Sequence, residues 1–396
     1  MIYKKIDYLF RSIILYLVDL LKLIYLKPAD ILVNFIPCKT QNKNLCLIKT
    51  DEIGDYVLFR NFIEILKKDN KYKGYKIILL GNITWKNLAE ELDGEFVDEF
   101  IWIDKNNFLT NLLYRYRFLK KFSSKNPEIL INCSYSRNFY LDDSIAAVTS
   151  ASQKISFKTD LSNSYKWQIL ISNKYYSTLV DSSNEVFDFY KYRSFFENLL
   201  QTKIDLIKPQ INLNDESNLV EIYNDYVIFF TGGRRKYKKW KLDYFIDTAN
   251  FIISKYNMNI LLAGTEQEAK DNNLLYNQIE HKEKVKDLSG QTSLTELVSL
   301  LNKAKLLITN DSGIVHIAAS VNTKTIVILN GSQFGRFLPY PNELGVYIST
   351  LYPAAIMENL SEVNFLYKKF QYRSLLDINS IQPEQVKNEI EIMMTN

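Results

Sequence analysis

The 396-residue chain is poor in the residues that build metal centres and disulfide frameworks. It has three cysteines, an odd number, and none stand in a CxxC pair, so neither a disulfide framework nor a zinc site follows. Its two histidines, His281 and His316, are too few for a histidine-rich metal centre. The low use of cysteine favours a reducing, cytoplasmic compartment. We expect no metal and no cofactor.

Several common motifs are also absent. The sequence contains no GxSxG, HExxH, GxxxxGK[ST] or EF-hand pattern, which removes the more frequent hydrolase, P-loop and calcium-binding classes. A net charge of +4 lacks the basic excess of a nucleic-acid-binding protein. The hydrophobic fraction of 47% is too high for a disordered chain, and the length suggests two domains with a core each.

The small positive charge is unevenly distributed. Residues 1–50 carry eight Lys or Arg and three Asp, whereas the remaining residues sum to −1. All of the positive excess therefore lies near the amino terminus.

Residues 1–36 lack the features of a signal peptide or a membrane-spanning helix. No small-residue cleavage site follows the apolar stretch, and Arg11, Asp19, Lys22 and Lys27 leave no uncharged run of about 18 residues. Long apolar stretches flanked by cations and tyrosines instead predict an amphipathic helix lying in the headgroup plane of an anionic membrane. The alternative is an amphipathic helix packed on the protein body.

From residue 44 onward, short β-rich runs alternate with helical patterns. The expected strands are NLCLIKT, KIILLGN, FVDEFIWID, EILINCS and KISF. After the first of them, YVLFRNFIEILKK places Leu58, Phe62, Ile65 and Leu66 on one helical face. This alternation predicts a parallel, doubly wound α/β sheet.

A polar run with one proline at 205–222 breaks the pattern and reads as a linker. A second α/β series follows, with DYVIFFT, NILLAG, KLLITN and TIVILNG as strands and a capping box from Ser293 to Glu296. We expect a helical segment over 1–40, a Rossmann-like acceptor-binding domain over 41–210 and a Rossmann-like nucleotide-sugar-binding domain over 211–396. The two domains would face an interdomain cleft.

The strongest anion-binding signal is TGGRRKYKKWK at 231–241. Gly232 and Gly233 follow an expected strand and let backbone amides approach a phosphate. Six cations follow without an intervening acid, namely Arg234, Arg235, Lys236, Lys238, Lys239 and Lys241. The loop therefore suits a diphosphate, although a solvated basic loop that contacts nothing has the same composition.

A second signal is NDSGIVHIAAS at 310–320, which follows a strand and opens a short helix. The Ser312 hydroxyl and the amides near Gly313 suit phosphate oxygens. Asp311 could cap the helix and orient the loop, or it could be a structural cap alone. His316 lies one turn into the helix, and the alternative to a role in the site is a buried core histidine.

The third signal is KTDEIGDYVL at 49–58. Gly54 permits a tight turn, and Asp55 starts the next helix as an N-cap or serves as a general base at the end of a strand. Asp51 and Glu52 are nearby carboxylates that could share the task or raise the pKa of Asp55.

Taken in order, these stretches resemble glycosyltransferase family 9, the ADP-heptose–lipopolysaccharide heptosyltransferases of the GT-B fold. LIKTDEIGDYVLFRNFIEILKK is similar to the family's opening strand, turn and first helix. TGGRRKYKKWKLDYF is similar to its small-residue loop with a lysine shortly before a tryptophan, and LLAGTEQE to its glycine-containing strand end. DLSGQTSLTELVSLLNKAKLLITNDSGIVHIAAS resembles the family's most distinctive run, and the likeness covers roughly residues 44–340.

The resemblance implies an inverting, metal-independent transfer of a sugar from a nucleotide donor. It implies Asp55 as the general base that deprotonates the acceptor hydroxyl and Lys238 as a contact to the donor phosphates. Either Glu266 or Glu268 would lie near the ribose. The remaining implied donor contacts are Thr231, Gly232, Gly233, Asp311, Ser312, Gly313 and His316.

The chain departs from the family pattern at three places, one of which is an amino-terminal stretch of forty residues beyond the usual family start. Ile314 replaces a proline, and NGSQFGRFLPYP replaces a Gly-Pro-Thr turn, which makes Arg336 a candidate contact to donor or acceptor. Asp51 and Arg137 are further acceptor candidates.

The expected function is transfer of heptose from ADP-heptose to lipopolysaccharide or another lipid-linked surface glycan. The enzyme would lie peripherally on the inner face of the bacterial cytoplasmic membrane, held by residues 1–36, without a nucleic-acid partner. Two alternatives stay open, a protein acceptor and a catalytically inactive nucleotide-sugar-binding protein.

Overall fold

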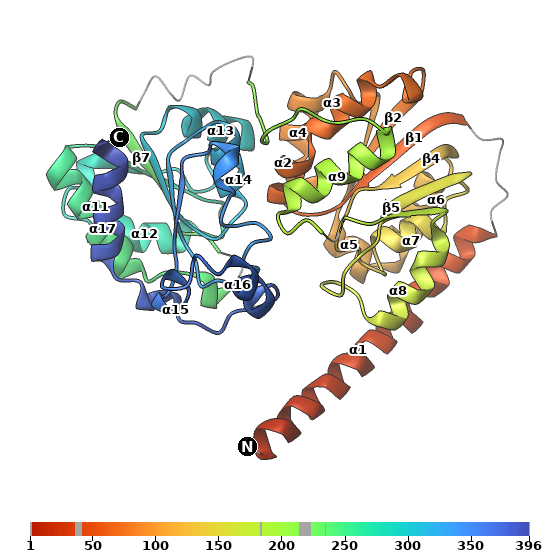
Figure 1. Ribbon diagram of the computed structural model, residues 1–396, viewed down its shortest axis with the longest axis horizontal. Coiled ribbons are helices and arrows are strands. Elements are labelled where there is room, and N and C mark those ends of the chain that lie inside the picture. The colour runs from red at the N-terminus through yellow and green to blue at the C-terminus, as the bar shows by residue number, and fades with distance from the viewer. Residues whose placement is uncertain (1, 36–41, 183, 214–222, 234, 396) are drawn as a thin grey trace. The chain divides into compact units, whose positions relative to one another are not determined.

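The computed structural model describes residues 2–35, 42–182, 184–213, 223–233 and 235–395 (Figure 1). Within the first helix, side chains are described for residue 14 and from residue 16 onward. Arg234, the end of the expected amino-terminal segment and the second half of the expected linker over 205–222 lie outside the described residues.

The chain forms two compact units, each assembled from several segments. Unit 1 comprises Met1–Asp51, Lys67–Lys86 and Glu95–Ser182, and unit 2 comprises Glu52–Leu66, Asn87–Gly94 and Ser183–Asn396. The domain boundaries expected at residues 40 and 210 stay a prediction.

Unit 1 is built on a parallel six-stranded sheet with the order β3-β2-β1-β4-β5-β6. Its strands are β1 (Asn42–Lys49), β2 (Lys76–Asn82), β3 (Glu99–Ile103), β4 (Pro127–Asn132), β5 (Gln153–Phe157) and β6 (Thr178–Val180). The first five confirm the expected strands. β1 and β2 contain buried apolar runs, Leu45–Ile48 and Ile77–Leu80, as is usual for parallel strands covered on both faces. The sequence did not predict β6, which has only three residues.

The helices of unit 1 cover the sheet and contribute to one core. They are α1 (Ile2–Asn34), α5 (Lys105–Thr110), α6 (Leu112–Ser123), α7 (Asp142–Ala147) and α8 (Lys166–Ser172). Cys46 and Ile48 of β1 pack with Phe108 of α5 and Leu119 of α6, and Val33 of α1 belongs to the same core. Among the described residues, no helix combines the length and the apolar content needed to cross a bilayer.

Unit 2 has a second parallel six-stranded sheet, with the order β12-β11-β10-β7-β8-β9. Its strands are β7 (Tyr226–Phe230), β8 (Asn259–Ala263), β9 (Val285–Asp287), β10 (Leu306–Asn310), β11 (Thr325–Ile328) and β12 (Ile348–Leu351). Four of these were expected. The sequence did not predict β9 or β12, which have three and four residues and carry polar side chains.

The helices of unit 2 include the expected ones. They are α2 (Ile53–Phe59), α3 (Asn61–Lys68), α4 (Lys86–Asp93), α9 (Asp188–Leu200), α11 (Leu242–Tyr256), α12 (Ala269–Gln278), α13 (Leu294–Lys303), α14 (Ile314–Ser320), α15 (Ala354–Met357), α16 (Val363–Phe370) and α17 (Pro383–Thr395), with α3 and α4 each crossing a unit boundary. Phe229 of β7 packs with Phe245 of α11 and Val386 of α17 in the core. The expected capping box is present, because Ser293 and Glu296 each accept a hydrogen bond from the other's backbone amide.

The single helix expected over 56–68 is instead two helices, α2 and α3, separated at Arg60. The Arg60 guanidinium is held by Asp93 at 2.7 Å and by the carbonyl of Gln210 at 2.7 Å. At this point the Ile63 amide bonds to the Arg60 carbonyl, three residues back, which tightens the turn. These partners are distant in the sequence, so the periodicity could not reveal the interruption.

Candidate active site

The two glycine-containing loops of unit 2 leave the same edge of its sheet. Strand β7 precedes the loop at 231–241, strand β10 precedes residues 311–313, and β7 and β10 pair in parallel. The carboxyl ends of neighbouring parallel strands form the usual ligand-binding edge of such a sheet. The fold therefore places both expected anion-binding loops together.

The Asn310 side chain joins the two loops. Its Nδ2 donates to the carbonyl of Thr231 at 2.8 Å and to that of Gly232 at 3.3 Å, and its Oδ1 accepts from the Trp240 amide at 3.0 Å. Asn310 is fully buried, so these bonds satisfy polar groups that water does not reach. Asn310 was not among the site residues expected from the sequence, although it is the first residue of the NDSG motif.

Lys238 and Asp311 form an ion pair between the same loops. The Nζ of Lys238 lies 2.5 Å from Oδ2 of Asp311, and the side chains are 14% and 19% exposed. Asp311 does not cap α14, because Gly313 occupies the N-cap position and no side chain caps the helix there. Ser312 follows Asp311 in the chain, and its hydroxyl oxygen lies 3.4 Å from the hydroxyl oxygen of Thr309.

Gly54 is needed for a close approach and not for the expected turn. Helix α2 begins at Ile53, so Asp55 lies in its first turn and Glu52 is the N-cap residue. A Cβ added to Gly54 would lie 2.7 Å from Cδ2 of His316 and 3.3 Å from the Cα of Gly313. The absence of a side chain thus lets α2, which carries the half-buried Asp55, pack directly against the start of α14.

His316 is buried within unit 2 and contacts aromatic side chains. Its Nδ1 lies 2.7 Å from the hydroxyl of Tyr340, and its ring packs near that of Phe337. Burial lowers the pKa of His316 to about 4, against smaller opposing effects of Asp311 and Asp188. The imidazole is therefore neutral near pH 7 and contributes no positive charge to this site.

Of the two glutamates expected near the ribose, Glu268 lies beside the 231–233 loop. Its carboxyl carbon would be 3.2 Å from a Cβ on Gly232, and its Oε2 accepts hydrogen bonds from the amide and hydroxyl of Thr265. Glu266 is exposed and lies against Gly290.

Arg336 is bound to the start of α9. Its Nε donates to both carboxylate oxygens of Asp188, at 3.1 and 2.9 Å, and Lys191 binds Oδ1 of Asp188 at 2.8 Å. Burial alone would raise the pKa of Asp188, but the charges of Arg336 and Lys191 outweigh it and lower that pKa. Asp188 is thus the described partner of the Arg336 Nε, and a contact of Arg336 to donor or acceptor stays a prediction.

The other two acceptor candidates lie in unit 1. Asp51 pairs with buried Lys49 at 2.5 Å, and its carbonyl accepts from Asn82 and from Trp85. Arg137 is fully buried, where its Nη1 lies 3.2 Å from Oδ1 of Asp143. The exposed part of Asp51 thus makes it the more accessible of the two.

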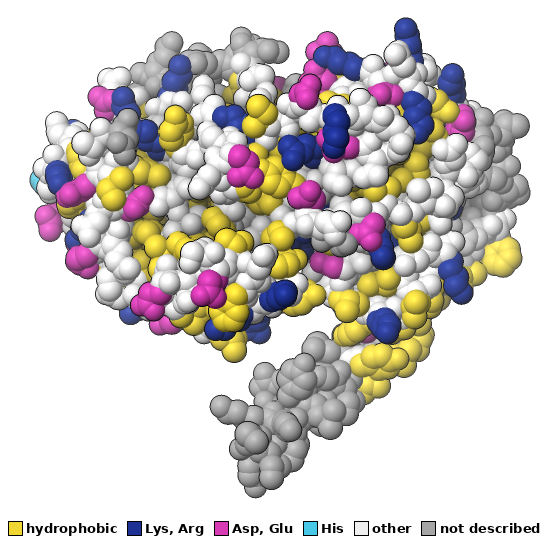
Figure 2. All heavy atoms as spheres, in the orientation of Figure 1, with side chains coloured by type: hydrophobic (Ala, Val, Ile, Leu, Met, Phe, Trp, Pro, Cys, Tyr) yellow, Lys and Arg dark blue, Asp and Glu magenta, His cyan; other side chains and the backbone are white. Residues whose placement is uncertain are grey.

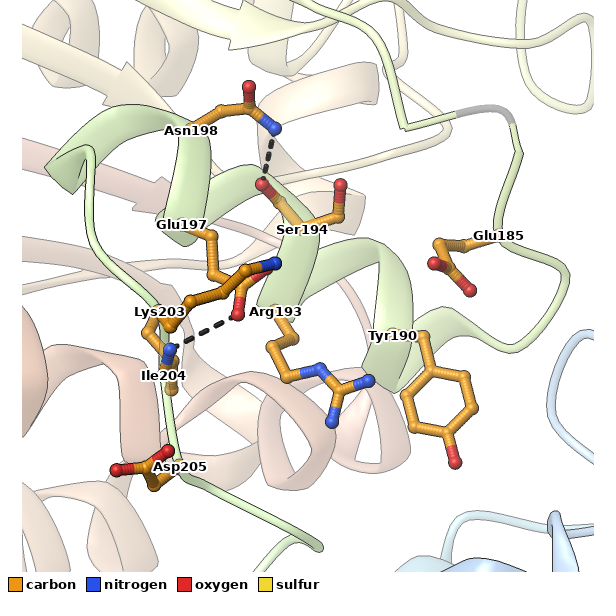
Figure 3. Close-up of a pocket in the computed structure, with 9 residues that line it drawn as sticks. All are labelled: Glu185, Tyr190, Arg193, Ser194, Glu197, Asn198, Lys203, Ile204 and Asp205. Atoms are coloured by element: carbon orange, nitrogen blue, oxygen red, sulfur yellow. Dashed lines mark hydrogen bonds and ion pairs between the residues drawn. The ribbon is translucent and has the colours of Figure 1, made fainter.

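A polar pocket of about 550 Å³ opens beside α9 (Figure 3). Its lining residues are Glu185, Tyr190, Arg193, Ser194, Glu197, Asn198, Lys203, Ile204 and Asp205. The pocket mixes acids with cations and includes none of the expected site residues. In the part of the chain that the structure describes, no group of three or more His, Cys, Asp or Glu side chains could hold a metal ion.

The chain is similar to known heptosyltransferases. Residues 130–364 match the profile of glycosyltransferase family 9 (heptosyltransferase). Lipooligosaccharide heptosyltransferase 2 of Campylobacter jejuni is 27% identical over 157 residues, covering 39% of this chain and 49% of that protein. The chain thus spans about half the length of the curated relatives it matches.

Solved structures show the same fold. ADP-heptose LPS heptosyltransferase II of Escherichia coli has a TM-score of 0.66 at 15% identity, covering 89% of this chain and 98% of that chain. Heptosyltransferase WaaC of E. coli with ADP has a TM-score of 0.67 at 13% identity, covering 88% and 99%. These likenesses confirm the expected GT-B architecture of two Rossmann-like halves, with an amino-terminal helix in addition. Because the family profile covers more than half of its length, the chain belongs to glycosyltransferase family 9, the heptosyltransferase family.

Proposed function

We propose that this protein is an inverting, metal-independent glycosyltransferase that moves heptose from ADP-heptose to a lipopolysaccharide or other lipid-linked acceptor. The observation that carries the proposal is the Lys238–Asp311 pair, which brings the basic loop and the NDSG loop together at the ligand-binding edge of unit 2. A relative named for ADP-heptose and a structural neighbour with bound ADP support the choice of donor.

In this proposal, unit 2 holds the donor. Lys238 binds the diphosphate, and the backbone of Thr231, Gly232 and Gly233 approaches it closely because the two glycines have no side chains. Ser312 donates its hydroxyl to a phosphate oxygen, and Glu268 accepts from the ribose. Gly313 and buried His316 shape the loop, and the neutral imidazole acts through Tyr340 and not through charge.

Asp55 is the general base of the proposed reaction. Its carboxylate takes the proton of the acceptor hydroxyl as that oxygen forms a bond to the anomeric carbon of the sugar. The bond from the anomeric carbon to the diphosphate breaks on the opposite face, and the electron pair leaves with the diphosphate. Because attack and departure take place on opposite faces, the configuration at the anomeric carbon inverts. The Lys238 cation stabilises the charge that develops on the leaving group.

Unit 1 is the proposed acceptor side, with Asp51 as an accessible contact. The acceptor is a lipid-linked glycan, which places the enzyme at the inner face of the cytoplasmic membrane. This location follows from the proposed acceptor and from the amino-terminal helix.

The test is transfer by the full chain from ADP-heptose to a lipopolysaccharide-type acceptor, with UDP-, GDP- and CMP-sugars as a panel. We expect Asp55→Asn to lower kcat at least a hundredfold while the KM for the donor changes little, because a general base contributes mainly in the transition state. The matched control is Asp243→Asn, which changes another aspartate in the first turn of a helix of unit 2.

Full activity of Asp55→Asn would overturn the proposed role of Asp55. Binding of ADP without transfer to any acceptor would identify an inactive nucleotide-sugar-binding protein, and transfer only to polypeptide would identify a protein acceptor.

A further inference from the structure

The described side chains of helix α1 form two apolar faces, and protein covers one of these two faces. We propose that the uncovered face of α1, together with neighbouring apolar residues of α8, is a fixed docking surface for an anionic lipid bilayer. The inference rests on the proposed function in one respect, because a lipid-linked acceptor lies in the bilayer that this surface would bind. The sequence alone left two alternatives for this helix, binding to a membrane and packing on the protein.

The covered face packs into unit 1. Leu26 and Val33 are each 1% exposed, and Ala29 between them is also buried. Leu26 packs against Phe139 and Tyr140, and Val33 joins the core of the sheet. The carboxyl-terminal half of α1 is therefore part of the folded unit and not a loose extension.

A buried ion pair fixes the position of α1. Both carboxylate oxygens of Asp30 accept hydrogen bonds from Arg115 of α6, at 2.7 and 3.0 Å, and Arg115 is wholly buried. Lys27 also binds Asp30, at 3.0 Å, and reaches the Ser144 hydroxyl at 2.9 Å. Bidentate pairs of this kind set orientation as well as distance.

The other acid of the described part of α1 is also bound on the covered side. Asp19 accepts from Gln168 of α8 at 2.9 Å, and its carbonyl accepts from the Tyr140 hydroxyl at 2.8 Å. Both carboxylates with described side chains in α1, Asp19 and Asp30, are thus directed to unit 1. Neither would repel an anionic surface on the opposite side.

The uncovered face is wide and apolar. Leu21 and Ile24 are 65% and 64% exposed, and the described exposed apolar residues of α1 and the residue after it are Ile14, Tyr16, Leu17, Val18, Leu20, Leu21, Ile24, Tyr25, Ile31, Leu32 and Phe35. Apart from Tyr16, at its edge, they lie within an arc of about 160° at 100° per residue, opposite Leu26 and Val33. Figure 2 shows hydrophobic side chains gathered on the described part of this helix.

Lipid fits this face better than a second copy of the helix. Ile14, Leu17, Leu21 and Ile24 have the three-and-four spacing of a coiled-coil seam. A coiled coil flanks that seam with charged residues, whereas here Val18, Leu20, Tyr25 and Leu32 flank it and are also exposed. Over the described side chains, an arc of this width carries no charge and suits a helix lying at the bilayer boundary.

The apolar surface continues onto α8, which lies beside α1 (Figure 1). The rings of Tyr16 and Tyr165 are 6.3 Å apart, and Leu170 and Ile171 of α8 are exposed. Exposed lysines lie at Lys22, Lys166 and Lys174. Lysines near an apolar face add attraction to anionic lipid, which matches the positive excess of the first fifty residues.

Vesicle binding by the full chain tests this surface. We expect sedimentation with vesicles that contain phosphatidylglycerol, and weaker binding to pure phosphatidylcholine, with about a fivefold loss for each lysine changed to glutamine. Leu21→Glu with Ile24→Glu should lower the bound fraction at least tenfold. Leu375→Glu is the matched control, since Leu375 is an exposed leucine of unit 2 and its change should leave binding unaltered.

A second variant separates a fixed surface from a flexible anchor. Leu170→Glu should also weaken vesicle binding if α1 and α8 contact the bilayer together, and unchanged binding would overturn the part played by α8. Unchanged binding of the α1 variant would overturn the whole inference. So would a dimer in sedimentation velocity that the α1 variant dissociates, without vesicle binding by the unaltered chain.

These results are distinguishable from failure of the proposed function. Transfer to a water-soluble, delipidated acceptor should not change in the α1 variant, because α1 has no part in the proposed chemistry. If the unaltered chain binds vesicles as expected but transfers no sugar, the docking surface stands and the proposed function falls.

Discussion

The Nζ of Lys238 lies 2.5 Å from Oδ2 of Asp311, so the lysine expected to bind the donor phosphates is paired with a carboxylate of the neighbouring loop. The pair is mostly shielded from water, which strengthens it relative to a surface ion pair. In the proposed function, Asp311 keeps Lys238 directed at the donor site before the diphosphate arrives.

Removing the Lys238 charge should weaken donor binding and slow transfer. We expect Lys238→Met to lower kcat/KM for the donor about ten- to a hundredfold, because a charge-assisted hydrogen bond contributes about 1.5–3 kcal/mol. Lys239→Met is the control, since Lys239 pairs with Asp271 at 3.0 Å and is more exposed. Steady-state kinetics and calorimetry with ADP measure both variants, and equal effects would contradict a specific role for Lys238.

Gly54→Ala should impair the enzyme although it adds only a methyl group. The new Cβ would lie 2.7 Å from Cδ2 of His316, which Tyr340 holds in place, and 3.3 Å from the Cα of Gly313. We expect a loss of about 1–3 kcal/mol in the free energy of unfolding. Displacement of the helix that carries Asp55 should also lower kcat tenfold or more.

A double-mutant cycle with His316→Ser tests the cause of this effect. If the clash with the imidazole is responsible, the second change should recover part of the stability lost in Gly54→Ala. Strictly additive losses in the two variants would show that the residues do not act on each other.

Arg336→Met should destabilise unit 2 through Asp188. The change leaves a wholly buried carboxylate with Lys191 as its remaining described cation, and we expect a loss of about 2–4 kcal/mol in the free energy of unfolding. Arg193→Met, which changes a half-buried arginine of α9 that lies over the Tyr190 ring, should cost far less. A raised KM for the acceptor with no change in Tm would instead favour a direct acceptor contact.

Asp142 should make unit 1 less stable as the pH rises. Burial, and then the charge of Asp51, raise the pKa of Asp142 to about 7, well above the usual value for an aspartate. Between about pH 4 and pH 7 the folded protein therefore binds a proton that the unfolded chain does not. The stabilisation is fully present below this range and is lost as the pH rises through it.

The Asp142→Asn variant removes this titration. We expect the fall in Tm between pH 5 and pH 7.5 to become smaller than in the unaltered chain, as measured by thermal unfolding in buffers of matched ionic strength. Asp98→Asn is the control, because Asp98 lies near the surface and its pKa is lowered, not raised. Identical pH profiles for Asp142→Asn and the unaltered chain would contradict the prediction.

The two α/β series, the long apolar strands and the loops with glycine and lysine could all be predicted from the amino-acid sequence alone. These features are local, because a strand buried on both faces must be apolar over consecutive residues and a phosphate-binding loop needs glycine in a short stretch. The capping box at Ser293 was predictable for the same reason, since both partners lie within one turn. Short edge strands such as β6 and β9 have too few residues to give such a signal.

The contacts between distant side chains could be identified only from the tertiary structure. The pairing of Lys238 with Asp311, the bridging by Asn310 and the contact of Gly54 with His316 join residues far apart in the sequence. The same holds for α1, whose amphipathic pattern fitted both a membrane and a protein surface. The bond from Asp30 to Arg115 fixes one face of that helix on unit 1 and leaves the other exposed, which periodicity within a single helix cannot reveal.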